Sequence, residues 1–352
     1  MLSSLSNILS KRRERLHIAF VVFELTDACN QQCRFCYNYF KSEGVPCTVA
    51  APDYRAARRT LDRLLREASV GSISLSGGEP MLMPRIHDLV MRARFAGTRV
   101  NLLTNGTLLG EDDIAIFGDL GISTIQIPIL SHRAETHDHI TQLRGSWQRA
   151  MASAQRLAAE HSEKFVPVFI LSRLNAADIE PTLDVYAELG VKRIMLNRFN
   201  IGGLGIKHAD ELSLSHDELR EAFERADRHL GELGMKAHNG VCTPMCLLDP
   251  KAYPNITFTH CTTDLTTRPL TINYRGEVRF CNHSPRILGN IHRESLDRII
   301  ERSATDGYFD TIPEQCGACS LWERCRGGCR AASEQLYGTF DRIDPIIEQK
   351  TK

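Results

Sequence analysis

The sequence predicts an α/β protein that begins with six strand–helix units and continues into a small cysteine-rich region. Between residues 17 and 200, short apolar segments alternate with longer segments whose apolar residues recur at helical spacing. This alternation is typical of right-handed βαβ units around a parallel sheet. After about residue 241 the alternation stops, and turn-forming residues and cysteines take its place.

The expected elements follow in the order strand, helix. We expect strands at residues 18–23, 72–75, 99–103, 122–129, 165–171 and 193–196, and helices near 52–67, 84–96, 111–118, 146–160 and 177–189. A further amphipathic helix over 214–233 has Ser215 as its N-cap. Six units are two short of a closed eight-stranded barrel, and parallel α/β sheets hold ligands at the carboxyl ends of their strands.

We divide the chain into an N-terminal arm (1–16), the strand–helix region (17–205), a helical bridge (206–240) and the cysteine-rich region (241–352). The arm carries apolar residues at helical spacing, followed by a basic cluster. It fits a short helix over one end of the sheet or, alternatively, a helix at a membrane surface.

Composition excludes several classes of function. The 352 residues include 43 Lys and Arg against 43 Asp and Glu, so no charge excess favours nucleic acid or an anionic membrane. No apolar run is long enough to span a membrane or to form a signal peptide. The 12 cysteines are clustered, with none between Cys47 and Cys242. Clustered thiolate ligands need a reducing compartment, so we expect a cytoplasmic protein.

The first cysteine cluster is Cys29, Cys33 and Cys36, which follow the first expected strand at C-x3-C-x2-C spacing. Three thiolates on one loop fit three corners of a cubane [4Fe–4S] cluster and leave one iron without a protein ligand. A structural zinc loop is the alternative for grouped cysteines.

This cysteine motif, with Phe35 before its third cysteine and Tyr37 after it, resembles that of the radical S-adenosylmethionine (SAM) superfamily. The resemblance implies a partial, open (β/α)6 barrel. It implies that the amine and carboxylate of SAM chelate the open iron, and that SAM is cleaved to a 5′-deoxyadenosyl radical that abstracts hydrogen from a substrate. Cys29, Cys33 and Cys36 are then the catalytic cluster ligands, with Phe35 and Tyr37 beside the cofactors.

Two further motifs match the family's SAM site. The run Ser76-Gly-Gly-Glu-Pro80 follows the second strand, and the resemblance assigns Gly77, Gly78 and Glu79 to the SAM amine. Glycines allow a close backbone approach, and a carboxylate suits an ammonium group. Thr104 and Asn105 end the third strand and resemble residues that line the SAM site; a polar strand-to-helix turn is the alternative.

Four other residues are assigned to SAM or substrate on weaker patterns. Relatives usually place a serine after the fourth strand, and here Ser131 stands at a shifted position. Arg144 suits the SAM carboxylate because a guanidinium binds carboxylates in a bidentate manner. Asn197 and Arg198 end the sixth strand and are expected to face the cavity. The glycine run 202–205 that follows is a weaker candidate for phosphate binding.

The second cysteine group resembles the SPASM extension of radical SAM enzymes. Its pattern is Cys261-x14-Gly276-x4-Cys281, then Cys316-x2-Cys319-x5-Cys325-x3-Cys329. The resemblance implies two auxiliary [4Fe–4S] clusters, three in total. The first would be held by Cys261, Cys281 and Cys329, and the second by Cys316, Cys319 and Cys325.

Two departures affect the last ligands. Ile346 and Ile347 stand where relatives carry a seventh cysteine, so Asp341, Asp344, water or substrate would complete the second cluster. An additional pair, Cys242 and Cys246, precedes Cys261. We expect one of the pair, Cys246 by its proximity in sequence, to complete the first cluster, the alternative being free thiols.

Peptide modification is the function that the resemblance favours, either an oxidation or a cross-link in a ribosomally made peptide. Asn282 stands where sulfatase maturases carry a catalytic aspartate, which disfavours that activity. Oxidation of a small molecule or of a haem- or quinone-pathway precursor is the alternative. An electron carrier is disfavoured because it needs no SAM site.

The expected partners are a flavodoxin or ferredoxin reductant and a precursor peptide. Because only about sixteen residues precede the first strand, leader recognition is expected to need a separate leader-binding protein or the SPASM surface.

Overall fold

The computed structural model describes residues 15–42, 51–262, 269–304 and 311–348. Most of the predicted N-terminal arm and Cys47 lie outside these ranges. In the described part of the chain no helix is long and apolar enough to cross a membrane.

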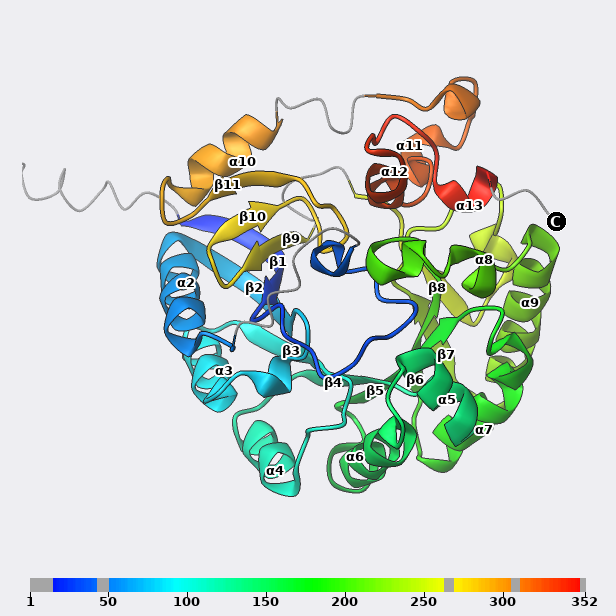
Figure 1. Ribbon diagram of the computed structural model, residues 1–352, viewed down its shortest axis with the longest axis horizontal. Helices are drawn as coiled ribbons and strands as arrows, with labels where there is room; N and C mark the ends of the chain where they lie inside the picture. Colours follow the sequence, from blue (N-terminus) through cyan, green and yellow to red (C-terminus); the bar gives the residue numbers. More distant parts are fainter. Residues whose placement is uncertain (1–14, 43–50, 263–268, 305–310, 349–352) are drawn as a thin grey trace, which may run out of the picture.

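One curved sheet forms the centre of the molecule (Figure 1). Its described strands lie in the order β11-β10-β9-β1-β2-β3-β4-β5-β6-β7-β8. The first eight run parallel to their neighbours, β9 is parallel to β1, and β10 and β11 are antiparallel. Their bounds are β1 (Leu16–Glu24), β2 (Ala68–Ser76), β3 (Arg99–Leu103), β4 (Thr124–Pro128), β5 (Phe165–Leu171), β6 (Arg193–Arg198), β7 (Lys236–Asn239), β8 (Ile256–Phe258), β9 (Leu270–Asn273), β10 (Glu277–Arg279) and β11 (Ile287–Asn290).

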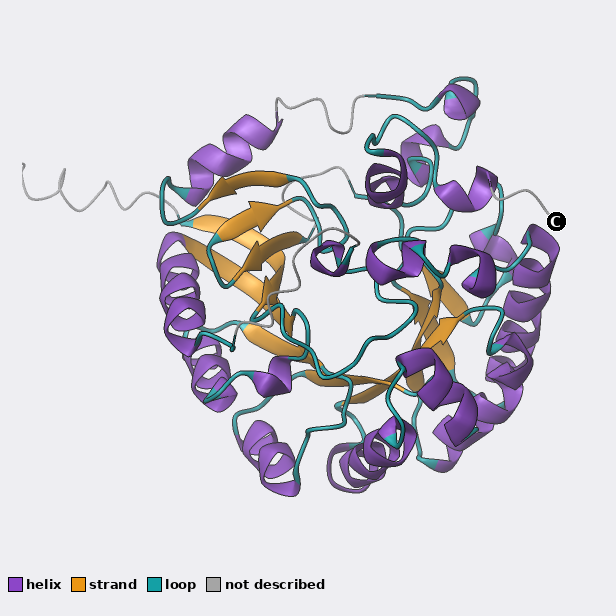
Figure 2. Cartoon of the chain, viewed as in Figure 1, coloured by secondary structure: helices purple, strands orange, loops and turns teal. Residues whose placement is uncertain are grey.

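The longer helices surround the outside of the curved sheet, and Figure 2 shows them in purple. Those around the parallel strands are α2 (Tyr54–Glu67), α3 (Ile86–Phe95), α4 (Glu111–Asp119), α5 (Ala134–Thr141), α6 (Ser146–His161), α7 (Ile179–Glu188), α8 (Ala209–Leu212) and α9 (His216–Glu232). The later ones are α10 (Leu296–Ala304), α11 (Trp322–Cys325), α12 (Arg330–Tyr337) and α13 (Pro345–Glu348). Ser215 caps α9 as predicted, since its hydroxyl accepts from the Glu218 amide.

The predicted partial α/β barrel is confirmed, and its sheet extends beyond the six predicted strands. β7 lies in the predicted bridge, and β8 to β11 lie in the predicted cysteine-rich region. These strands have three or four residues each, too few to produce an apolar run that sequence periodicity detects. The sheet stays open because β8 and β11 are its two edges. The domain boundaries themselves stay a prediction.

Alternation along the strands separates core from cavity. On β2 to β6, one set of side chains packs beneath the helices in the main hydrophobic core, including Ile73, Leu75, Val100, Leu102, Ile125, Ile127, Phe169, Leu171, Ile194 and Leu196. The residues between them point to the inner side, because successive strand residues face opposite ways. Several of these inner residues are polar: the Asn101 amide donates to Ser72 and Ser74, and Thr124 donates to Asn101. The sheet therefore has an apolar outer face and a partly polar inner one.

Candidate functional site

A cavity of about 200 Å³ lies at the carboxyl ends of the inner strands. The strands contribute Ser76, Leu103, Gln126, Pro128, Val168, Ile170 and Asn197. The loop after β1 and the turns after β2 and β3 contribute Cys29, Gln31, Cys33, Phe35, Cys36, Tyr37, Asn38, Lys41, Gly78, Glu79, Thr104 and Asn105, and α5 adds His137 and Thr141. The structure thus brings the predicted cysteine triad and most of the predicted SAM residues around one cavity.

The two glycines after β2 hold the start of the cysteine loop. The Gly78 amide donates to the Thr26 carbonyl over 2.7 Å, and the Glu79 amide donates to Ala28 over 2.8 Å. A Cβ on Gly78 would lie 2.0 Å from the Ala28 oxygen, and Gly77 has a φ of +121°. Larger residues therefore do not fit here. Gly78 lines the cavity, whereas Gly77 serves the contact with the loop.

Glu79 is almost fully buried, yet its carboxylate has three donors. Thr104 Oγ1 donates to it over 2.6 Å, and the Asn105 and Met81 amides donate over 2.8 and 2.9 Å. Burial raises the pKa of Glu79, and these donors oppose the rise by favouring the charged form. A buried, oriented carboxylate in a cavity wall is suited to receive an ammonium group.

Asn105 also ties the end of β3 to the cysteine loop. Its amide donates to Asn30 over 2.7 Å, and Asn30 in turn donates to Thr107 over 2.8 Å. Asn30 directly follows Cys29, so this chain of bonds fixes the first cysteine relative to the Glu79 turn. The predicted Thr104 and Asn105 therefore contribute both to the lining and to the shape of the cavity.

The three cysteines of the loop are half-buried. Burial raises the pKa of Cys29, Cys33 and Cys36, and for Cys33 the two other thiols add to the rise. A bound metal is what would stabilise three thiolates held so close together.

Lys41 is a cavity residue that the motif analysis missed. It lies in the short helix η1 (Tyr39–Lys41), is 7% exposed, and donates to the Gln31 carbonyl over 2.9 Å. Burial lowers the pKa of Lys41, while the Cys36, Cys29 and Cys33 thiols raise it, and the net change is upward. A buried ammonium among thiolates reduces the negative charge that they bring together. The signal in the sequence was only a lysine five residues after the triad.

Phe35 and Tyr37 flank the third cysteine on opposite sides. Phe35 packs against a small apolar cluster that contains Phe199, Ile201 and Leu212. Tyr37 is half-buried, and desolvation raises its pKa; its hydroxyl accepts a 2.6 Å hydrogen bond from Asn282. Both residues line the cavity as predicted.

Ser131 and Arg144 do not line the cavity. Ser131 is fully buried behind it, where its hydroxyl donates to Asp178 over 2.6 Å and accepts from the Arg133 amide. Arg144 is exposed in the turn before α6. The sequence pattern singled out these two residues but does not show in which direction their side chains point. The geometry does not support their assignment to SAM.

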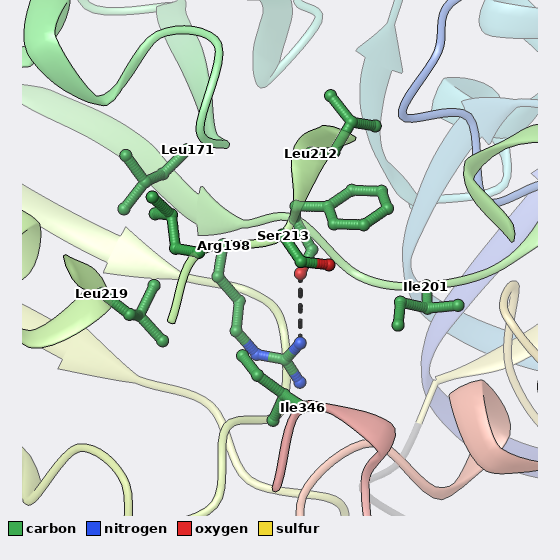
Figure 3. Close-up of a pocket in the computed structure, with 9 residues that line it drawn as sticks. Leu171, Arg198, Ile201, Leu212, Ser213, Leu219 and Ile346 are labelled. Atoms are coloured by element: carbon green, nitrogen blue, oxygen red, sulfur yellow. Dashed lines mark hydrogen bonds between the residues drawn. The ribbon is translucent and has the colours of Figure 1, made fainter. Parts of the chain in front are cut away.

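The side chains of Asn197 and Arg198 point to opposite sides of the sheet, because neighbouring strand residues face opposite ways. Asn197 lines the cavity and accepts from the Gly240 amide over 2.8 Å. Arg198 lies instead on the outer side, among the apolar side chains of Leu171, Leu219 and Ile346 (Figure 3). The space there is about 10 Å³, room for about one water molecule. Arg198 forms a buried ion pair with Asp344. Its predicted contact with SAM or substrate is therefore replaced by a link to the C-terminal segment.

The glycine run after β6 also serves packing. A Cβ on Gly203 would lie 2.5 Å from the Cys36 and Asn38 carbonyl oxygens. The Gly205 amide donates to the Cys36 carbonyl over 3.2 Å. The run thus covers the cysteine loop, and the phosphate alternative is not supported.

His137 is a second cavity residue outside the predicted set. It is 1% exposed, and its Nδ1 accepts from the Leu130 amide over 3.1 Å. Burial lowers its pKa to about 4, so the ring is neutral at pH 7. With Nδ1 as an acceptor the proton is on Nε2, which is buried and has no protein partner. This N–H is available to a molecule in the cavity.

The C-terminal cysteines gather into two further groups. Cys242, Cys261, Cys281 and Cys329 form the first, which we name the inner group. The Cys242 and Cys261 thiols are hydrogen-bonded, and the other two thiols are close enough to raise the pKa of Cys242 further. Burial and then Asp344 and Cys281 raise the pKa of Cys329 to about 12.

The remaining four, Cys246, Cys316, Cys319 and Cys325, form what we name the outer group. Burial, followed by Cys325, Cys319 and Cys246, raises the pKa of Cys316 to about 11. Burial, Cys325 and Cys319 also raise the pKa of Cys246. The expectation that Cys246 lies with the first C-terminal group is therefore wrong: Cys242 lies there, and Cys246 lies with the second. Sequence proximity to Cys261 was a poor guide, because the loop carries its two cysteines to opposite sides.

The donor chemistry of the three groups fits iron–sulfur clusters. All eleven described cysteines are free thiols. In the described ranges no three His, Cys, Asp or Glu side chains are arranged to hold a single metal ion. A cubane presents its irons at separate corners, so its ligands stand farther apart than those of one ion. Soft thiolates bind zinc, Cu(I) and iron–sulfur clusters, and the donor sets here are compatible with clusters.

Two family models match the chain. One, described as the radical SAM superfamily, matches residues 23–186, and one described as the SPASM iron–sulfur cluster-binding domain matches residues 261–327.

Curated relatives align along most of the chain. A PqqA peptide cyclase of Gluconobacter oxydans (strain 621H) is 27% identical over 92% of this chain and 88% of the relative. A protein of the same name from Xanthomonas campestris pv. campestris (strain 8004) is 28% identical over 94% and 86%.

Solved structures share the fold. Streptococcus suis SuiB bound to S-adenosylmethionine superimposes with a TM-score of 0.71, at 17% identity over 99% of this chain and 83% of SuiB. The structure of anSMEcpe with AdoMet and the Cp18Cys peptide gives 0.68, at 15% identity over 94% of both chains.

Proposed function

Because the chain belongs to the radical SAM superfamily and carries a SPASM domain, we propose that this enzyme modifies a ribosomally made peptide by oxidation or cross-linking. The observation that carries the proposal is the single cavity that joins the Cys29–Cys36 triad to the buried Glu79 carboxylate. The curated relatives are named for cyclisation of the PqqA peptide and align over most of their length, which supports a peptide substrate.

The residues present fit three [4Fe–4S] clusters and SAM. Cys29, Cys33 and Cys36 would hold the first cluster, and the inner and outer groups would hold one each. Glu79 would accept from the SAM amine. When bound, the cluster held by Cys29, Cys33 and Cys36 would, together with SAM, supply a 5′-deoxyadenosyl radical that abstracts a hydrogen atom from the substrate.

The chain's own residues then position the reactants. Val168 and Ile170 give the cavity an apolar wall that excludes water, and Gln126 and Asn197 add amides beside it. The free Nε2–H of His137 offers a donor from α5. Such a wall, apolar with a few fixed polar groups, suits a buried side chain of a peptide.

The proposal includes partners and a compartment. Reduction of the cavity cluster needs a one-electron donor of the flavodoxin or ferredoxin type. A separate leader-binding protein is proposed to present the precursor peptide. Thiolate-ligated clusters need a reducing compartment, which is the cytoplasm.

The test is anaerobic co-expression with a short open reading frame beside the gene, followed by mass spectrometry of that peptide. Loss of two hydrogens per modified residue, absent in Cys33→Ala, is the expected result. An unchanged peptide, in a preparation that still produces 5′-deoxyadenosine, would overturn the peptide proposal and favour a small-molecule or cofactor precursor.

The roles of the clusters are tested separately. Cys29→Ala is expected to abolish SAM cleavage, whereas Cys316→Ala is expected to keep part of it and lose the product. Equal loss of cleavage in both variants, each shown to be folded, would contradict this division.

A further inference from the structure

The segment 316–325 supplies only three of the thiols of the outer group, so the fourth ligand of its cluster has to come from another part of the chain. The segment at Ile346 and Ile347 carries no thiol, and both side chains pack in apolar clusters. Ile347 packs beside Cys316 and Trp322, so α13 gives this group an apolar cover.

The two carboxylates near that segment are also unsuited as ligands. Asp344 is fully buried and bonded to Arg198, and its oxygens accept from the Cys329 and Ile346 amides over 2.8 and 3.1 Å. These bonds place it beside the inner group. Asp341 is exposed on the surface.

The loop after β7 reaches both groups. At its start, Arg198 donates to the Cys242 carbonyl over 2.8 Å and to the Thr243 hydroxyl over 3.1 Å, which anchors Cys242 on the buried side. The Leu247 and Leu248 amides then donate to the Pro244 carbonyl, so the chain turns between the two cysteines.

Within this turn the loop meets α11. The Met245 amide donates to the Cys325 sulfur over 3.3 Å, which brings the next residue, Cys246, beside the outer group. Cys246 and Cys319 are exposed, whereas Cys316 and Cys325 are buried. The four thiols thus surround a site from its solvent side and its core side.

We propose that Cys246 is the fourth ligand of the outer cluster, so that this cluster is held by four thiolates from the β7 loop and the segment 316–325. Cys242 takes the corresponding place in the inner cluster. The proposal rests on the clusters of the proposed function, but not on the peptide substrate. Four thiolates leave no open iron, so the outer cluster transfers electrons and does not bind substrate.

The experiment counts iron in the full-length chain after anaerobic reconstitution. Cys29, Cys33 and Cys36 are first replaced by Ala, which leaves about eight irons in two clusters. In this background Cys246→Ala is expected to leave about four irons. Adding Cys319→Ala should remove no more, because the same cluster is already lost, whereas adding Cys281→Ala should remove the rest. Cys47→Ala, which changes a cysteine assigned to no cluster, is the control.

The opposite pattern, with additional loss from Cys319→Ala and none from Cys281→Ala, would assign Cys246 to the inner group and overturn the proposal. Full iron content in Cys246→Ala would show that Cys246 is no ligand. If Cys246→Ala loses all iron, the variant Cys246→Asp distinguishes the two assignments. In the Cys281→Ala background only the outer cluster remains, and the oxygen ligand should change its EPR signal. In the Cys319→Ala background only the inner cluster remains, and its EPR signal should stay unchanged. A changed signal only in the latter would contradict the proposal. None of these readouts depends on a peptide.

Discussion

The Asn282 side-chain amide donates to the Tyr37 hydroxyl over 2.6 Å. Tyr37 directly follows the last cysteine of the cavity triad, and Asn282 directly follows Cys281 of the inner group. This hydrogen bond therefore connects the two cluster-binding regions directly. In this bond the hydroxyl oxygen of Tyr37 is the acceptor.

This bond gives the first prediction. Asn282→Ala and Tyr37→Phe are each expected to lower product formation about fivefold, since one hydrogen bond contributes roughly 1 kcal/mol. The double variant should be no slower than the slower single one, because both remove the same bond. The wild type, the two single variants and the double variant are compared by the product formed per chain at equal iron content. Additive losses, as expected for the control pair Asn282→Ala with Tyr39→Phe, would show that the bond has no role.

Glu79 gives the second prediction. Glu79→Gln keeps the shape of the side chain and removes its charge, so SAM is expected to bind ten- to a hundredfold more weakly, in keeping with roughly 1.5–3 kcal/mol for a hydrogen bond to a charged group. Equilibrium dialysis of SAM against anaerobically reconstituted protein measures the dissociation constant. Iron content equal to that of the wild type is the control. An unchanged constant would exclude Glu79 from the SAM site.

The third prediction separates two glycines. A Cβ on Gly78 meets the Ala28 oxygen at 2.0 Å, whereas one on Gly97 meets nothing within 4 Å. Gly78→Ala is expected to displace the cysteine loop and lose most of the iron of the first cluster. Gly97→Ala, strained only by its φ of +81°, is expected to cost about 1 kcal/mol and to keep full iron. Equal iron in both variants would contradict the role of the Gly78 contact.

Much of this site was predictable where a residue's role depends on local spacing. The triad, Glu79 and the Thr104–Asn105 turn follow strands directly, so the topology alone brings them to one edge of the sheet. Arg198 was predicted wrongly because neighbouring strand residues point to opposite faces, and a one-residue difference in register exchanges them. Its partner Asp344 lies 146 residues away, a distance over which local patterns carry no information.

Long-range packing also explains the other differences. The position of Cys246 beside Cys325 depends on a turn at Pro244, which the C-x3-C spacing of Cys242 and Cys246 does not specify. β9 joins the sheet beside β1 across about 250 residues, with only four residues of its own. The burial of Lys41 and His137 depends on how the loop after β1 and α5 close over the cavity. Such positions become visible only when the whole chain is folded.

His137 gives the last prediction, a dependence of stability on pH. Its pKa is about 4 in the folded protein and 6.5 in an exposed chain. Above pH 6.5 both states are neutral and the protein has its full stability. As the pH falls from 6.5 towards 4, the unfolded chain takes up a proton that the folded chain excludes, so stability is lost.

By pH 5.5 this loss is roughly 1.4 kcal/mol, which corresponds to a few degrees in the midpoint of thermal unfolding. His137→Asn keeps an acceptor near the Nδ1 position for the Leu130 amide but does not titrate. We therefore expect the wild-type midpoint to fall about 2–5 °C more than that of His137→Asn between pH 7.5 and 5.5. Taking the difference between the two proteins cancels the acid sensitivity of the clusters. Parallel decreases in both would mean that the His137 ring is protonated without cost, and that its Nε2 is not the enclosed donor described here.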